Sequence, residues 1–220
     1  MNAVDTTIFV IDDDAAVCRS LARLLHSSGF HVETFSGAQE FLARPAFSGT
    51  GCVILDVCMS GITGPELHER MSEDGLSLPV IFLTGHGDVP TSVKAMKKGA
   101  VDFLLKPVDD EVLLEAVRQA VKRHAAEQAR ERERERINAR LARLSLRERE
   151  VMEHVIGGQL NKQIAADLGI AEKTVKVHRG RLMEKMEVGS VAELVHLCES
   201  VGIEPGRAGG GDSLPAHPLR

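Results

Sequence analysis

Tryptophan and tyrosine are absent from this 220-residue chain, and phenylalanine contributes only seven aromatic rings. Long apolar runs are missing too, since none approaches the roughly 18–20 residues that a membrane-spanning helix needs. No basic region precedes an apolar one at the start, so we expect no secretory signal. The four cysteines have neither CxxC nor metal-ligand spacing, which is typical of reduced thiols. These absences argue against membrane and disulfide-rich classes and predict a cytoplasmic globular protein.

The net charge of −5 is unevenly divided along the chain. Residues 1–121 hold 9 Lys/Arg and 17 Asp/Glu, a net −8, whereas residues 122–220 hold 18 and 15, a net +3. An acidic half joined to a mildly basic half is typical of a regulatory domain joined to a nucleic-acid-binding module. Chance variation in surface charge would give the same totals, so charge supports this interpretation only weakly.

Short apolar runs alternate with helical patterns over the first half. Most of these runs are apolar rather than alternating, which indicates strands of a parallel sheet that is covered on both faces. The five predicted strands are Thr7–Ile11, Phe30–Phe35, Cys52–Asp56, Val80–Thr84 and Val101–Leu105. We therefore expect a doubly wound, flavodoxin-like α/β domain over residues 1–122.

Capping residues mark the helix starts in this half. A short polar side chain accepts a backbone N–H of the first turn, and a Glu or Gln three residues later can return the bond. We expect single caps at Asp14 and Asp88, and capping boxes at Ser36–Gln39 and Thr63–Glu66. Asp88 would begin a helix over Val89–Lys98, and a last helix would begin at about Asp109.

A charged segment over residues 123–143 separates the two halves. Its Glu and Arg residues are spaced to pair along a helix, as Glu131 and Arg134 are, so we expect it to continue the preceding helix as a solvated linker. A thin apolar seam that includes Ile137 and Leu141 leaves a dimerisation helix as the alternative. We favour the spacer, because the apolar content is low.

The second half predicts an all-α domain of four short helices over residues 144–203. They are Leu146–Ile156, Lys162–Leu168 with Asn161 as its cap, Glu172–Met186 and Val191–Val201. The middle two, joined by a turn at Gly169, form a helix-turn-helix. The tail over residues 204–220 is rich in Gly and Pro, and we expect it to be disordered.

Chemically distinctive residues follow four of the predicted strands. Asp12 and Asp13 follow the first, Asp56 ends the third, Thr84 ends the fourth, and Lys106 with Pro107 follows the fifth. The carboxyl ends of parallel strands meet at one edge, so these side chains should converge there. Carboxylate oxygens suit Mg²⁺, and Asp56 can then act as a nucleophile toward a phosphodonor. Mg²⁺ and Lys106 would neutralise charge on the phosphoryl oxygens, and Thr84 would hydrogen-bond the new group.

These residues closely resemble the receiver domain of bacterial two-component response regulators over residues 6–122. The runs Thr84–Pro90 and Ala95–Phe103 are similar to the FixJ branch. The resemblance implies that Asp56 is the phosphoacceptor and that Asp12, Asp13, Asp56 and the backbone carbonyl of Cys58 surround Mg²⁺. It also implies that Thr84 and Phe103 are a switch pair and that Lys106 contacts the phosphoryl group before a cis Pro107.

Two departures from the receiver pattern lie beside Asp56. Ser60 stands where proline is usual after Met59, which we expect to loosen the loop. Cys58 occupies a variable position near the phosphate. A redox-sensing role for its thiol is one interpretation, and an inert thiol is the favoured one.

The helix-turn-helix has an apolar inner face and a basic outer face. Ile164, Val175 and Leu182 would pack the two helices together, while basic side chains on the outer face contact DNA phosphates or guanine edges. Segments Leu144–Glu150, Asn161–Ala165 and Lys173–His178 resemble the LuxR-type domain of NarL/FixJ regulators, over about residues 143–201. The expected DNA-binding residues are Lys162, Lys173, Thr174, Lys176, Val177, Gly180 and Arg181.

Two further departures concern helix starts in this domain. Leu146 stands where the family usually has proline, and Ala171 where a capping Ser or Thr is common. The missing cap should cost about 1 kcal/mol. By family analogy, Val191–Val201 helps to pair two DNA-binding domains.

The resemblance implies a phosphorylation-activated transcriptional regulator rather than an enzyme. A sensor histidine kinase would phosphorylate Asp56, the receivers would form a homodimer, and the paired helix-turn-helix domains would bind double-stranded promoter DNA, with RNA polymerase as a further partner. Two alternatives stay open: a regulator that binds DNA without phosphorylation, and an aspartate-nucleophile phosphatase. The second draws on the Asp-x-Asp spacing of Asp12 and Asp14.

Overall fold

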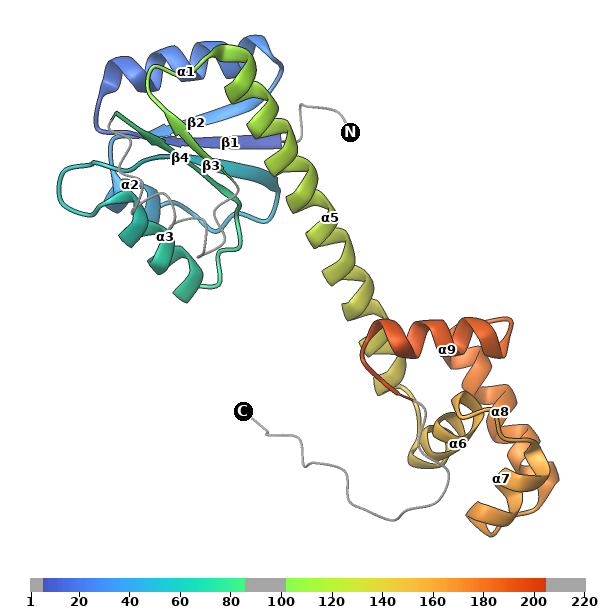
Figure 1. Cartoon of the computed structure of the whole chain (residues 1–220). Coiled ribbons are helices and arrows are strands. Elements are labelled where there is room, and N and C mark those ends of the chain that lie inside the picture. The colour runs from blue at the N-terminus through green and yellow to red at the C-terminus, as the bar shows by residue number, and fades with distance from the viewer. Residues whose placement is uncertain (1–5, 86–101, 205–220) are drawn as a thin grey trace. The chain divides into compact units, whose positions relative to one another are not determined.

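The computed structural model describes residues 6–85 and 102–204, so the predicted helix Val89–Lys98 and the tail beyond Glu204 lie outside the described residues. The chain forms two compact units, divided between Ala129 and Arg130 (Figure 1). No helix among the described residues is both long and apolar enough to cross a membrane.

The first unit is built on a five-stranded parallel sheet with the order β2-β1-β3-β4-β5. The strands are β1 (Thr6–Ile11), β2 (His31–Phe35), β3 (Thr50–Asp56), β4 (Val80–Thr84) and β5 (Asp102–Leu105). The predicted doubly wound α/β fold is confirmed, with β4 as predicted and the other four strand starts different by one or two residues.

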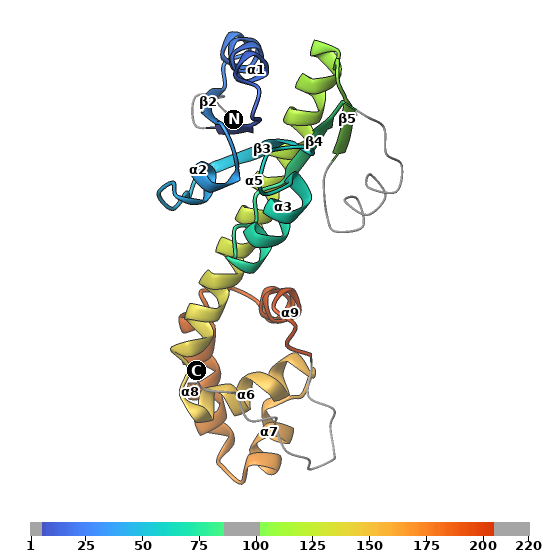
Figure 2. The ribbon, with the colours of Figure 1, turned by 90° about the vertical axis from the view of Figure 1, so that its left-hand side faces the viewer.

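Helices cover both faces of this sheet. Figures 1 and 2 show α1 (Ala15–Ser27) on one side and α2 (Ala38–Leu42) with α3 (Gly64–Glu73) on the other. Successive strand residues face opposite ways, so Phe9 packs with α2 and α3 while its neighbour Ile8 packs with α1. Both side chains are almost fully buried, and each such burial stabilises the fold by about 1.5–3 kcal/mol. These two apolar layers hold the strand ends in place.

The predicted caps are confirmed at α1 and α3 but not at α2. Asp14 Oδ1 accepts the Ala16 N–H at 2.7 Å, and Thr63 with Glu66 forms a complete capping box. The Ser36–Gln39 box is wrong, because α2 begins after Gly37. Glu40 accepts both the N–H and the hydroxyl of Ser36 instead, each at 2.8 Å. A carboxylate is a stronger acceptor than the Gln39 amide.

The charged segment continues α5, which runs from Asp110 to Ala142, as predicted. Its solvated character holds only for the middle turns, where residues 129–136 are exposed. Before them, His124 is buried and its Nδ1 accepts the Gly51 N–H at 3.1 Å, while Gln128 Nε2 donates to the Gly49 carbonyl at 2.9 Å. Burial lowers the pKa of His124, so the ring is neutral at pH 7. The first part of the linker therefore belongs to the first unit, where it is hydrogen-bonded to the start of β3.

The second unit contains the four predicted helices: α6 (Leu146–Ile156), α7 (Asn161–Leu168), α8 (Glu172–Met186) and α9 (Val191–Ser200). Ile137 and Leu141 from the end of α5 are buried in the same core as Val151 and Leu182. The expectation of a fully solvated linker is therefore wrong at this end too, because its apolar seam completes the core of the second unit.

The predicted cap at Asn161 is also wrong. Asn161 is the first residue of α7, and the preceding Leu160 N–H donates to Gln163 Oε1 at 2.8 Å. The Asn161 side chain instead accepts Arg179 Nη1 from α8 at 3.0 Å. A hydrogen bond between α7 and α8 therefore takes the place of the predicted bond from the Asn161 side chain to the first turn of its own helix.

Candidate functional site

The carboxylates that follow β1 and β3 meet at the carboxyl end of the sheet. Asp12 and Asp56 are buried, with 2% and 6% exposure, while Asp13 is exposed. One oxygen from each of the three lies within 4.8 Å of the others. Buried like charges at this separation repel one another unless a cation offsets them.

Lys106 supplies part of that offset. Its Nζ donates to Asp12 Oδ2 at 2.6 Å and to Asp56 Oδ1 at 2.7 Å, although the two residues it joins are 44 positions apart. Burial alone would lower the pKa of Lys106, but the hydrogen bonds that it donates to both carboxylates raise the pKa above the ordinary value, so the ammonium stays charged. Three carboxylates and one ammonium leave a net charge of about −2, which suits a divalent cation.

A backbone amide donates to one oxygen of each carboxylate. The Asp14 N–H donates to Asp12 Oδ1 at 2.9 Å, and the Cys58 N–H donates to Asp56 Oδ2 at 3.0 Å. The Ser60 N–H donates to Asp13 Oδ2 at 2.9 Å. The residue types had identified the carboxylates but not these amides, because every residue except proline carries the same donor.

Gly64 explains how α3 comes so close to this loop. A Cβ at this position would lie 2.3 Å from the Asp56 carbonyl oxygen, a separation that no side chain tolerates. The Gly64 N–H also donates to the Val57 carbonyl at 3.1 Å, closing the loop between β3 and α3. The absence of a side chain here fixes the path of residues 57–63 beside Asp56.

The other predicted residues of the first unit surround the same edge. Thr84 is buried at the end of β4, and its carbonyl accepts the Lys106 N–H at 2.7 Å. Phe103 on β5 is half-buried, with its ring centroid 6.2 Å from that of Phe82. The Lys106–Pro107 peptide bond is cis, as the resemblance implied. The roles assigned to Thr84, Phe103 and the Cys58 carbonyl stay predictions.

The cysteines of this unit fall into two environments. Cys18 was missed as a neighbour of the site: its buried thiol donates to the Asp12 carbonyl at 3.3 Å, and burial raises its pKa. Burial raises the pKa of Cys52 to about 12. Both are therefore protonated at pH 7 and unreactive. Cys58, in contrast, is exposed in the loop after β3.

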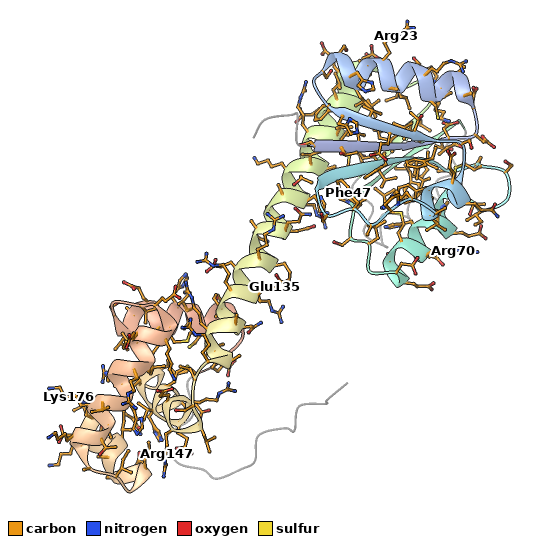
Figure 3. The ribbon with its side chains drawn as sticks, turned by 180° about the vertical axis from the view of Figure 1, so that it is seen from behind. Arg23, Phe47, Arg70, Glu135, Arg147 and Lys176 are labelled. Carbon is orange, nitrogen blue, oxygen red and sulfur yellow. The ribbon has the colours of Figure 1, made fainter. Side chains whose placement is uncertain are left out.

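The basic face of α8 lies on the surface of the second unit, where Figure 3 shows Lys176 pointing outward. Val175, Leu182 and Met186 on its other face are fully buried. A Cβ at Gly180 would meet no described atom within 4 Å, so the outer surface is open at this point. The exposed residues on α7 and α8 include every predicted DNA-binding position: Lys162, Lys173, Thr174, Lys176, Val177, Gly180 and Arg181.

Charged pairs fix the far end of α8. Arg140 donates to the Met186 carbonyl at 3.3 Å and to Glu187 Oε2 at 2.7 Å. Lys185 Nζ donates to the buried Glu148 carboxylate at 2.6 Å, and this bond, with that from the Ser145 N–H, lowers the pKa of Glu148 to about 2. The end of α5 and the start of α6 therefore hold α8 at its C-terminus.

Comparison with known proteins matches both units. Residues 8–118 match the family model described as "Response regulator receiver domain", and residues 142–198 match "Bacterial regulatory proteins, luxR family". The chain is 46% identical over 198 residues to transcriptional regulatory protein FixJ of Azorhizobium caulinodans, covering 90% of this chain and 94% of that protein. It is 42% identical to response regulator protein TmoT of Ectopseudomonas mendocina, covering 90% of each. Among solved structures, response regulator StyR aligns with a TM-score of 0.82 at 43% identity, covering 89% of this chain and 98% of that one.

Proposed function

We propose that Asp56 is the phosphoacceptor of this chain, which belongs to the FixJ-like response regulators of two-component systems and regulates transcription in response to phosphorylation. The observation that carries this proposal is the placement of Lys106 between Asp12 and Asp56. An ammonium that already bridges the two carboxylates is in position to contact the oxygens of a phosphoryl group on Asp56.

The donor set fits a magnesium ion. Asp12, Asp13 and Asp56 offer three hard carboxylate oxygens within 4.8 Å of one another, and the carbonyl of Cys58 would complete the protein ligands. When bound, Mg²⁺ neutralises charge on the carboxylates and on the phosphoryl oxygens. This fit rests on the chemistry of the carboxylates and on the separation of their oxygens. The Cys58 residue that would offer its carbonyl also orients Asp56 through its backbone amide.

Phosphoryl transfer would then proceed at the buried carboxylate. An oxygen of Asp56 attacks phosphorus, the phosphorus–nitrogen bond of a phosphohistidine on the sensor kinase breaks, and the released histidine nitrogen takes up a proton. Lys106 remains paired with the added negative charge, and the Thr84 hydroxyl turns to hydrogen-bond the phosphoryl group. Phe103 follows inward, changing the face on which two receivers form a homodimer.

Dimerisation is what would make DNA binding strong. One α8 helix makes few phosphate contacts, and affinity for a polyanion grows with the number of contacts made together. We propose that residues 144–203 form the DNA-binding domain, that the exposed side chains of α8 enter the major groove, and that residues 1–122 and 123–143 form the receiver and linker. Promoter DNA and the sensor kinase are the expected partners in the cytoplasm, with RNA polymerase at the promoter.

The phosphatase alternative is disfavoured by the position of Asp14. Its carboxylate caps α1 at the surface by accepting the Ala16 N–H, whereas a phosphatase would need it beside Asp12 as a general acid. We therefore propose a regulator without turnover of a phosphomonoester substrate.

The test is to incubate the full chain with Mg²⁺ and acetyl phosphate and to separate the product on a phosphate-affinity gel. A retarded band in the wild type that is missing in Asp56→Asn is expected. Affinity for a promoter fragment, measured on the same samples, should rise only in the samples that show the retarded band. Equal DNA affinity with and without the band would instead favour the regulator that works independently of phosphorylation.

A further inference from the structure

The loop after β3 presents two amides to the acidic site, one on each side of a buried anchor. Cys58 and Ser60 are exposed, whereas Met59 between them is only 7% exposed and packs in the core beneath α2 and α3. The Cys58 N–H donates to Asp56 and the Ser60 N–H to Asp13. With Met59 held in the core, both amides stay directed at the carboxylates.

Asp13 depends on this loop more than the other two carboxylates do. Lys106 holds Asp12 and Asp56, which are buried, but Asp13 is exposed, and the Ser60 amide supplies its hydrogen bond among the described residues. An exposed carboxylate without such a bond would sample several rotamers. With Oδ2 bonded to Ser60, the side chain is confined to the position that places an oxygen within 4.8 Å of Asp12 and Asp56.

We propose that the backbone N–H of Ser60 positions Asp13 as a magnesium ligand, a role in which the serine hydroxyl has no part. The inference rests on the proposed function, because it requires the acidic site to bind Mg²⁺. Hydrogen bonds that orient a metal ligand commonly change metal affinity by about 10- to 100-fold. Proline at position 60 would lack the donor altogether.

Isothermal titration of the full chain with MgCl₂ tests the proposal with matched variants. Ser60→Ala removes the hydroxyl but keeps the N–H, so its dissociation constant should equal that of the wild type. Ser60→Pro removes the N–H, and we expect Mg²⁺ to bind about tenfold more weakly. Equal or tighter binding by Ser60→Pro would overturn the proposal, and so would an equal loss in Ser60→Ala.

A second measurement covers the case in which proline disturbs the loop. In ¹⁵N NMR spectra of the metal-free chain, a bond to a carboxylate moves the Ser60 amide proton downfield. Asp13→Ala should return it upfield and leave the Cys58 amide, which is bonded to Asp56, in place. An unmoved Ser60 resonance would contradict the proposal. Failure of the wild type to bind Mg²⁺ would reject the metal site itself. If the wild type binds Mg²⁺ and Ser60→Pro binds it with the same dissociation constant, only the role of Ser60 is rejected.

Discussion

The charged groups of the two units are arranged in opposite ways. At the end of the sheet, Lys106 is three-quarters buried and bonded to two buried carboxylates. On α8 the cations are exposed on an open surface. A small dianion is best stabilised by a few fixed charges in a site with little water, whereas a long polyanion is bound by many exposed charges acting together. The first arrangement suits a phosphoryl group, and the second suits DNA.

Loss of Lys106 should have the largest effect in this comparison. Lys106→Met leaves the buried Asp12 and Asp56 carboxylates without their cation, and we expect the free energy of unfolding of the first unit to fall by about 3–5 kcal/mol. Acetyl phosphate should no longer give a retarded band. Urea denaturation in EDTA measures the stability, and Arg118→Met, which removes an exposed cation paired with Glu115, serves as the control. A loss as small as that of the control would show that the buried pairs contribute little.

The pair of Glu148 and Lys185 predicts a pH dependence within the second unit. The pKa of Glu148 is about 2 in the folded chain, below its usual value of about 4.3 when unfolded. The stabilisation is therefore complete above pH 4.3 and is lost as the pH falls from 4.3 toward 2, by at most about 3 kcal/mol.

Urea denaturation at a series of pH values measures this effect. Glu148→Gln cannot ionise, so the difference in stability between it and the wild type should shrink over that window. A constant difference from pH 7 to pH 3 would exclude ionisation of Glu148 as its origin.

A single exposed cation on α8 should change binding without changing stability. Lys176→Ala is expected to weaken binding to all DNA sequences about equally, by several-fold. The slope of log K against log salt concentration should fall in magnitude by about one. Its unfolding free energy should stay within about 0.5 kcal/mol of the wild type. Fluorescence anisotropy over a range of salt concentrations measures the first effect. Arg147→Ala removes an equal charge on α6, and an equal loss there would point to net charge rather than to the α8 surface.

The smallest expected effect is a gain in stability at the start of α8. Ala171 occupies the N-cap and offers no side-chain acceptor, so Ala171→Ser should stabilise the second unit by about 0.5–1 kcal/mol. DNA affinity should not change. Thermal unfolding measures the gain, with Ala166→Ser inside α7 as the control. Destabilisation by Ala171→Ser would mean that the serine hydroxyl does not reach the amides of the first turn.

Local patterns succeeded where neighbouring residues determine the structure. Asp14 and Thr63 cap their helices as predicted, since the partner amide lies two or three residues away. Predictions failed where a partner from elsewhere competes: Asn161 bonds Arg179 on α8 rather than its own first turn. The prediction of a solvated linker fails for the same reason, because the buried contacts of His124 and Ile137 involve residues distant in sequence.

Apolar periodicity and strand direction are enough to predict the parallel sheet, the helix-turn-helix and the convergence of Asp12, Asp13 and Asp56, because they decide which strand ends meet. Which oxygen is bonded to which donor depends instead on the packing of the folded chain. Lys106 lies between two particular carboxylates, and the amide of Ser60 faces Asp13 because Met59 anchors the loop in the core. Backbone donors are the same in nearly every residue, so their partners are set by packing rather than by residue type.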